Sequence, residues 1–222
     1  MKIGILGTGM VGNTLGVGFL QKGHDVKMGS RDALNEKAME FTKLNGNNTG
    51  GQASQGTFAD AAQFGDIIFN CTKGEHSLEA LALAGEQNLA GKILVDVANP
   101  LDFSKGMPPT LSLVNDNSLG ETIQASYPSA NVVKTLNTLN ASLMTNPGKV
   151  AGGDHNLFIC GNDSVAKQQV KDLLHINFNW DPGNIIDLGD ITNSRATEQL
   201  LPIWIRLWGV LGTADFNFKI VQ

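Results

Sequence analysis

The sequence predicts an α/β protein with a doubly wound, mostly parallel β-sheet, and three observations indicate this class. Short apolar segments of strand length alternate with segments of helical periodicity through most of the chain. Residues 66–71 are almost continuously apolar, which is typical of a parallel strand covered by helices on both faces. A glycine-rich turn joins the first strand directly to the first helix.

The expected elements follow in a regular order. Strands are expected over residues 1–6, 25–28, 53–55, 66–71, 93–97, 131–136, 156–161 and 184–188. Helices are expected over residues 13–21, 32–44, 58–63, 77–84, 121–127 and 163–174, with a long C-terminal helix over 193–211. Residues 45–52 and 101–119 are expected to be loops. No linker or repeat interrupts this order, so we expect one domain over residues 1–222, with a small α/β extension from about residue 151.

The turn after the first strand has the pattern G-x-G-x-x-G in the run Gly7-Thr8-Gly9-Met10-Val11-Gly12. Between a strand and a helix, this pattern is the dinucleotide-binding fingerprint of Rossmann-type folds. Gly7 allows the tight turn, Gly9 lets a pyrophosphate approach the backbone, and Gly12 lets the helix pack closely on the strand. The helix N-terminus then offers free N–H groups to the phosphates. A purely structural turn is the alternative.

The end of the second strand indicates NADP rather than NAD. An NAD-binding protein carries an acidic residue there to hold the ribose hydroxyls, whereas this strand ends in Gly29-Ser30-Arg31. Ser30 can donate a hydrogen bond, the planar Arg31 guanidinium suits a 2′-phosphate, and Lys37 adds a second positive charge. Asp32 lies beyond the position of the ribose-binding acid and is expected to cap the next helix. A solvated surface pair of Ser30 and Arg31 is the alternative.

Composition and charge exclude several other functions. Of the 222 residues, 41% are hydrophobic, and the formal net charge is −5 without long runs of either sign. This pattern favours neither nucleic acid nor a membrane as a partner. No signal peptide precedes the first strand and no apolar run is long enough to span a bilayer, so a cytoplasmic protein is expected.

Cysteine and histidine usage predicts no metal site. Cys71 and Cys160 lie in apolar segments and are expected to be buried reduced thiols, with a disulfide or redox pair as the alternative. The four histidines match no zinc spacing. Only His76 follows a strand at the expected site, where it either contacts the cofactor or is a structural residue at a helix start. No catalytic triad or pair of carboxylates is present in the pattern, so no catalytic residue is predicted.

Several segments resemble the F420H2:NADP oxidoreductase family, the coenzyme F420-dependent NADP oxidoreductases. They are the glycine turn, Gly29-Ser30-Arg31, Asn99-Pro100-Leu101, and the run Asn193-Ser194-Arg195 followed by Glu198. The sixth strand, Val133-Lys134-Thr135-Leu136-Asn137-Thr138, is similar too. The same family includes the cytoplasmic domain of the STEAP metalloreductases. The resemblance covers nearly the whole chain, and its C-terminal segment is the most specific part.

The resemblance implies an arrangement of NADP along the sheet edge. Besides the glycine turn, the implied contacts are Ser30 and Arg31 at the 2′-phosphate, Cys71, Thr72 and His76 at the central part, and Ala98, Asn99 and Pro100 near the nicotinamide. In relatives a deazaflavin packs against the nicotinamide, and hydride passes directly between the two rings. The implied co-substrate is therefore coenzyme F420 or a flavin such as FMN. Such a transfer depends on closeness and stacking more than on acid–base groups.

Two residues are candidate contacts of the acceptor. Thr138 follows the sixth strand at the same sheet edge and either hydrogen-bonds the acceptor ring or is satisfied by backbone. Asn193 belongs to the resembling C-terminal segment but is also a good helix N-cap, with Glu198 as a partner in that cap. On the C-terminal helix, Trp204 and Trp208 lie one turn apart and are expected to pack in the core or between subunits, which predicts a homodimer.

Two other functions share the N-terminal features. An NADP-dependent reductase of a small imine or carbonyl compound usually adds a large helical domain, and only about thirty residues follow Asp190 here. A sensor that holds NADPH without turnover has the same binding residues. Steady NADPH oxidation with an added flavin or deazaflavin distinguishes an enzyme from a sensor.

Overall fold

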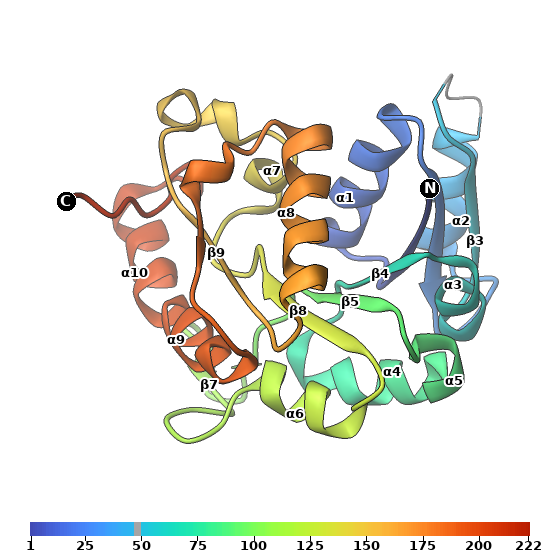
Figure 1. Cartoon of the computed structure of the whole chain (residues 1–222), viewed down its shortest axis with the longest axis horizontal. Helices are drawn as coiled ribbons and strands as arrows, with labels where there is room; N and C mark the ends of the chain where they lie inside the picture. Colours follow the sequence, from blue (N-terminus) through green and yellow to red (C-terminus); the bar gives the residue numbers. More distant parts are fainter. Residues whose placement is uncertain (47–49) are drawn as a thin grey trace.

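A computed structural model describes residues 1–46 and 50–222 and contains one large sheet (Figure 1). Its strand order is β10-β9-β8-β5-β4-β1-β2-β3. The strands are β1 (Lys2–Leu6), β2 (Asp25–Ser30), β3 (Ala53–Thr57), β4 (Ile67–Asn70), β5 (Ile93–Asp96), β8 (Asn131–Thr135), β9 (Leu157–Cys160) and β10 (Ile185–Asp187). Neighbouring strands are parallel from β8 through β5, β4, β1 and β2 to β3, whereas β9 pairs antiparallel with β8. The predicted doubly wound, mostly parallel sheet is confirmed.

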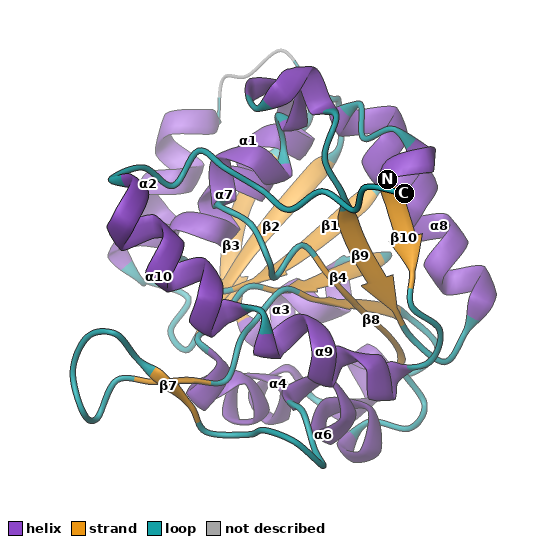
Figure 2. Cartoon of the chain, turned by 90° about the vertical axis from the view of Figure 1, so that its left-hand side faces the viewer, coloured by secondary structure: helices purple, strands orange, loops and turns teal. Residues whose placement is uncertain are grey.

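Helices cover both faces of the sheet (Figures 1 and 2). One face packs against α1 (Met10–Gln21), α2 (Glu36–Asn45), α7 (Ala141–Met144) and α8 (Ser164–Phe178). The other packs against α3 (Phe58–Phe64), α4 (Ser77–Ala84), α5 (Glu86–Leu89) and α6 (Leu119–Ser126). Within β4, Ile67 and Phe69 enter the first core and Ile68 the second. This alternation explains the continuous apolar run, because both faces of the strand are buried.

The second helix begins later than predicted, because the chain first makes a turn after β2. The Ser30 hydroxyl donates to the Asp32 carbonyl within this turn. The cap of α2 is Asn35, whose side-chain oxygen accepts from the backbone N–H groups of Lys37 and Ala38. The prediction that Asp32 caps this helix is therefore wrong. The predicted loop over 45–52 includes residues 47–49, which lie outside the described residues.

The segment predicted as a loop over 101–119 contains regular structure. Strands β6 (Leu101–Asp102) and β7 (Thr110–Leu111) form a short antiparallel hairpin, which projects from the body of the molecule (Figure 2). Helix α6 begins at Leu119, earlier than predicted, because the Ser118 hydroxyl caps it by accepting from the Glu121 N–H.

The long C-terminal helix is present as α9 (Ser194–Gln199) and α10 (Leu201–Leu211), which meet at Leu200. Pro202 lies in the first turn of α10, where the N–H that proline lacks has no helical partner anyway. The tail then returns to β9, because the Phe218 carbonyl accepts from the Asn156 N–H at 2.9 Å. No helix in the described part of the chain has the length and apolarity to cross a membrane.

Candidate functional site

A cavity of about 550 Å³ lies where β1, β2 and β4 end. Parallel strands bring their following loops to one sheet edge, which is where open α/β folds bind ligands. Among the predicted cofactor contacts, those that line it are Gly7, Thr8, Gly9, Ser30, Arg31, Lys37, Cys71, Thr72 and His76. Its other lining residues, which the sequence reasoning did not single out as contacts, are Asp32, Asn35, Phe58, Lys73, Glu79 and Ala80.

The three glycines of the turn have different surroundings. Gly7 has a φ of +119°, and a Cβ on it would lie 2.7 Å from the Cys71 carbonyl oxygen. A Cβ on Gly12 would lie 2.2 Å from the Gly7 carbonyl oxygen. A Cβ on Gly9, in contrast, would meet no atom within 4 Å. The space beside Gly9 is therefore open, and the N-terminus of α1 has no side-chain cap, so the turn fits the phosphates of a dinucleotide.

Three cationic side chains line the same cavity. Arg31 and Lys37 are exposed near the end of β2, and Lys73 lies on the loop after β4. Ser30 is buried with its hydroxyl directed to the Asp32 carbonyl, so its donation to a phosphate stays a prediction. Positive charge beside the second strand is the arrangement expected for a 2′-phosphate.

The loop after β4 carries the remaining predicted contacts in the cavity. The Thr72 hydroxyl donates to Asn70 Oδ1 at 2.7 Å, and that asparagine is fully buried at the end of β4. His76 lies in the short 3₁₀ turn η1 (Gly74–His76), half-exposed between Glu75 and Glu79. Thr72 is therefore fixed by the core, whereas His76 faces solvent.

Both cysteines are free thiols; Cys160 is buried as expected, whereas the residue Cys71 is half-buried at the cavity. Burial, and then the charge of Asp96, raises the pKa of Cys71 far above its ordinary value, and burial raises the pKa of Cys160 to about 12. Both thiols are therefore protonated at neutral pH and poor nucleophiles.

We expect iodoacetamide at about pH 8 to label Cys71 and Cys160 slowly in the native protein and rapidly after unfolding in urea. Mass spectrometry of timed samples measures both rates. Rapid native labelling of either residue would show that its thiol is accessible and ionised, contrary to this expectation.

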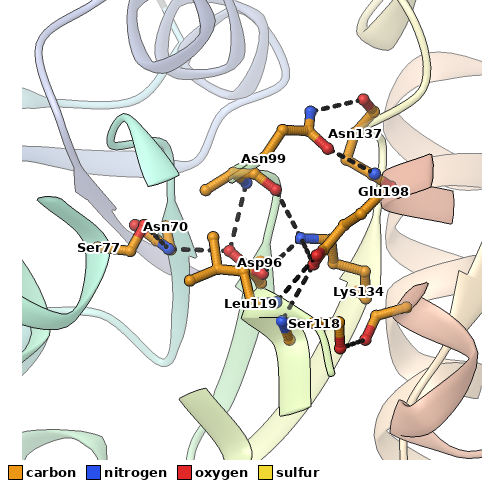
Figure 3. A network of polar contacts seen from close by, with 12 residues as sticks. Asn70, Ser77, Asp96, Asn99, Ser118, Leu119, Lys134, Asn137 and Glu198 are labelled. Atoms are coloured by element: carbon orange, nitrogen blue, oxygen red, sulfur yellow. Dashed lines mark hydrogen bonds and ion pairs between the residues drawn. The ribbon is translucent and has the colours of Figure 1, made fainter. Parts of the chain in front are cut away.

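A buried charge cluster lies beside the cavity, beneath the end of β5 (Figure 3). Lys134 on β8 has no exposed surface, and its Nζ lies 2.8 Å from Asp96 Oδ2 and 2.8 Å from Glu198 Oε1. It also donates to the Ala98 carbonyl at 2.5 Å. Burial alone would lower the pKa of Lys134, but the two carboxylates outweigh it and raise that pKa, so the ammonium is charged at neutral pH.

Glu198 caps a helix other than its own. Its carboxylate accepts from the backbone N–H groups of Leu119 at 2.9 Å and Gly120 at 3.1 Å, at the start of α6. The expectation that it caps the helix beginning near Asn193 is wrong, and Asn193 itself makes no side-chain cap. The N-terminus of α6 is the better location, because two free N–H groups and the helix dipole stabilise the buried carboxylate there.

The rest of the C-terminal motif also binds α6. Ser194 is buried, and its hydroxyl lies 2.7 Å from the Ser118 hydroxyl. Arg195 makes a two-pronged contact with Glu121, with its Nε donating to Oε2 at 2.7 Å and its Nη2 to Oε1 at 2.5 Å. These residues therefore join α9 to the segment that follows the hairpin.

Two asparagines pair at the ends of β5 and β8. Asn99 Nδ2 donates to the Asn137 carbonyl at 2.8 Å, and Asn137 Nδ2 donates to Asn99 Oδ1 at 2.9 Å. Leu136 has a φ of +63°, an uncommon conformation for a leucine that turns the chain into this pair. Asn137 is buried, and its Oδ1 has no hydrogen-bond partner among the described residues.

The other predicted contacts lie outside the cavity lining. Met10 is exposed at the start of α1 and Val11 is half-buried beside it. Ala98 is buried over Lys134, and the Asn99-Pro100 turn is close to the cavity loop, since a Cβ on Gly74 would lie 2.1 Å from the Asn99 carbonyl oxygen. The two predicted acceptor contacts differ in burial: Thr138 is buried, whereas Asn193 is half-buried and its side chain turns back to Asp190.

Sequence reasoning missed the roles of Asp96, Lys134 and Glu198. A usable signal was present, because Asp96 and Lys134 stand inside strands whose other residues are mostly apolar. A charged residue in such a strand requires a buried partner. The pairing itself joins segments far apart in the chain, so spacing alone does not reveal it.

Comparisons with known proteins agree with this geometry. A family model described as NADP oxidoreductase, coenzyme F420-dependent, matches residues 2–100. The F420-dependent NADP reductase of Methanocaldococcus jannaschii is 32% identical over 215 residues, which are 93% of this chain and 92% of that protein. The metalloreductase STEAP3 of Rattus norvegicus is 30% identical over 91% of this chain, which spans only 38% of that protein's length. A crystal structure from Arthrobacter sp. FB24, of a candidate F420-dependent NADP reductase, has a TM-score of 0.91 and 52% identity over 100% of both chains.

Proposed function

Since the chain belongs to the family of coenzyme F420-dependent NADP oxidoreductases, we propose that it transfers hydride between NADP(H) and coenzyme F420. The general class of activity, that of an NADP-dependent oxidoreductase, follows from membership of the family. The open space beside Gly9, with Arg31 on the loop after β2 and Lys37 in the first turn of α2, is the observation that carries the NADP half of the proposal. Its similarity to proteins named F420-dependent NADP reductases supports F420 as the second substrate.

The chain's own residues would hold and align the two substrates. NADP(H) supplies or accepts the hydride when bound. In our proposal Arg31 and Lys37 neutralise its 2′-phosphate, the uncapped N-terminus of α1 binds its pyrophosphate, and Asn99 and Pro100 lie near its nicotinamide. Transfer between two bound rings requires closeness, alignment and exclusion of water, which a rigid sheet edge provides.

The direct test is NADPH oxidation, followed at 340 nm, with purified protein and F420, FMN or no acceptor. We expect turnover with F420, and Gly9→Ala should lose it, because the added methyl occupies the space left for the pyrophosphate. Since that methyl meets no protein atom, the variant should fold normally, and circular dichroism checks this. Turnover with FMN but not F420 would replace the proposed acceptor, and binding of NADPH without turnover would favour a sensor.

We also propose that the protein is a homodimer through α10 and the tail. Ile203, Trp208 and Val210 of this helix are 52%, 45% and 84% exposed, and Val221 of the tail is 83% exposed. Trp204 stacks on Phe216, yet its buried indole N–H has no partner among the described residues. Apolar side chains gathered on one helix and an adjoining tail favour an interface with a second copy over free solvent exposure.

We expect Trp208→Arg to convert the protein from dimer to monomer, because it places a charge among these exposed apolar side chains. Sedimentation velocity at several concentrations measures the change. Val165→Arg, at an apolar residue of α8 that is 64% exposed, is the control and should stay dimeric. A monomeric wild-type protein throughout the concentration range contradicts the proposal.

A further inference from the structure

The turn that follows β5 is held from below by Lys134. Ala98 uses both of its backbone groups in this contact: its N–H donates to Asp96 Oδ1 at 3.2 Å, and its carbonyl accepts from Lys134 Nζ at 2.5 Å. The Asp96 carboxylate connects Ala98 with Lys134, because its other oxygen, Oδ2, accepts from Lys134 Nζ at 2.8 Å. The peptide before Asn99 is therefore fixed on both sides by one buried ion pair (Figure 3).

This ion pair determines where Asn99 can lie. Asn99 follows the fixed peptide directly and is fixed a second time by its two hydrogen bonds with Asn137. Its carbonyl accepts from the Leu101 N–H at 2.8 Å and packs closely on Gly74, where a Cβ would lie 2.1 Å from the carbonyl oxygen. A displacement of Ala98 would therefore move Asn99 and Pro100 together.

The same network continues to the nucleotide cavity. Asp96 Oδ1 accepts from Asn70 Nδ2 at 2.8 Å, and Asn70 Oδ1 accepts from the hydroxyl of Thr72, which lines the cavity. A chain of hydrogen bonds thus runs from Thr72 to Ala98 through Lys134, and Figure 3 shows its part from Asn70 through Asp96 to Lys134. Networks of this kind fix side chains in one arrangement when every member is satisfied.

We propose that Lys134 is a positioning residue for the nicotinamide half of NADP(H). It touches no open surface, so it acts through the Ala98 carbonyl, which it holds so that the Asn99-Pro100 turn is preformed for the ring. A preformed site binds more tightly because less ordering is required on binding. This inference rests on the proposed function, in which that turn is next to the nicotinamide. The adenosine half, held at Arg31, does not depend on Lys134.

Two ligands separate the halves of the site. Adenosine 2′,5′-bisphosphate contains the adenosine and both of its phosphates, whereas NADP⁺ adds the nicotinamide riboside phosphate. The variant for the test is Lys134→Met combined with Asp96→Asn, because removing both charges leaves the net charge of the three buried side chains at −1, and the remaining carboxylate, that of Glu198, keeps its hydrogen bonds from the Leu119 and Gly120 N–H groups. The single Lys134→Met variant, which leaves two buried carboxylates, is not needed for the test.

Lys167 supplies a matched control. Its buried Nζ donates to Asp187 Oδ1 at 2.8 Å and to the Gly189 carbonyl at 2.8 Å, so it too holds a carboxylate and a backbone carbonyl, but on α8 and outside the lining of the nucleotide cavity. Lys167→Met combined with Asp187→Asn therefore removes a lysine–aspartate pair of the same composition, in which the aspartate is 41% exposed. Calorimetric titration of both double variants and the wild type with the two ligands gives the dissociation constants.

For the Lys134 double variant we expect NADP⁺ to bind about tenfold more weakly and adenosine 2′,5′-bisphosphate to bind as in the wild type. The Lys167 double variant should bind both ligands normally. Unchanged NADP⁺ binding, or an equal loss for both ligands, would overturn the positioning role, since the second result indicates a general structural effect. If the wild-type protein binds NADP⁺ no more tightly than adenosine 2′,5′-bisphosphate, the nicotinamide half adds no affinity. In that case the proposed site of the nicotinamide ring is wrong instead.

Discussion

Lys134→Met is expected to lower the free energy of unfolding by about 3–5 kcal/mol, the usual cost of removing one partner from a buried ion pair. The side chain has no exposed surface, and the substitution leaves Asp96 and Glu198 as buried like charges without their shared cation. Methionine fills a similar volume, so the loss reflects charge rather than a cavity. Urea denaturation at neutral pH, followed by fluorescence or circular dichroism, measures the difference.

Lys149→Met is the control for this experiment. Lys149 also lies 2.8 Å from a carboxylate, that of Asp215, but both side chains are about 40% exposed, so its removal should cost no more than about 1 kcal/mol. A loss below about 1 kcal/mol for Lys134→Met would show that water reaches the buried cluster.

The pH dependence of this stabilisation follows from the raised pKa of Lys134. Because the folded-state pKa lies above its ordinary value of 10.5, the ion pair contributes fully below pH 10.5 and is lost as the pH rises through the folded-state value. The difference in unfolding free energy between wild type and Lys134→Met should therefore be constant from neutral pH to about pH 10 and narrow above it.

Arg31→Ala is expected to remove most of the preference for NADPH over NADH. A charge-assisted contact with the 2′-phosphate is worth about 1.5–3 kcal/mol, or roughly 10- to 150-fold in affinity. Arg31 is exposed at the cavity and makes no salt bridge with another described residue within 4 Å, so its loss should change binding rather than folding. Calorimetry with NADPH and NADH on wild type and variant gives the preference in each.

Lys43→Ala supplies the control, because Lys43 is also exposed and belongs to α2 but does not line the cavity. It should leave the preference unchanged. If neither nucleotide binds to the wild-type protein, the glycine turn is a structural feature only. If Arg31→Ala keeps the preference, Lys37 and Lys73 carry the phosphate contact between them.

Local features of the fold were predictable because they depend on neighbouring residues. The strands of the parallel sheet appear as apolar runs, since both faces of β4 are buried. The glycine turn was predictable because the backbone around Gly7 and Gly12 has no room for a Cβ, so that only glycine fits there. Boundaries were less accurate where a side chain competes for a cap, as when Asn35 rather than Asp32 begins α2.

Contacts between distant segments were not predictable from one sequence. Glu198 looks like part of the cap of its own helix, and only the packing of α9 on α6 brings it to Leu119 and Lys134. The hairpin over 101–111 was missed because strands of two residues have no measurable periodicity. Most of the cavity contacts could be proposed, in contrast, because they lie at or just after the ends of strands that share one edge of the sheet.

The capping of α6 by Glu198 determines how late during its synthesis the chain can finish folding. A ribosome adds residues at about 5–20 per second, and Glu198 is synthesised 64 residues after Lys134. For several seconds, therefore, a nascent chain holds the whole nucleotide edge while Lys134 and the start of α6 still lack their common carboxylate. Translation arrested before residue 198 should yield a partly folded chain that chaperones and proteases can recognise, and its last structural step must await the emergence of α9.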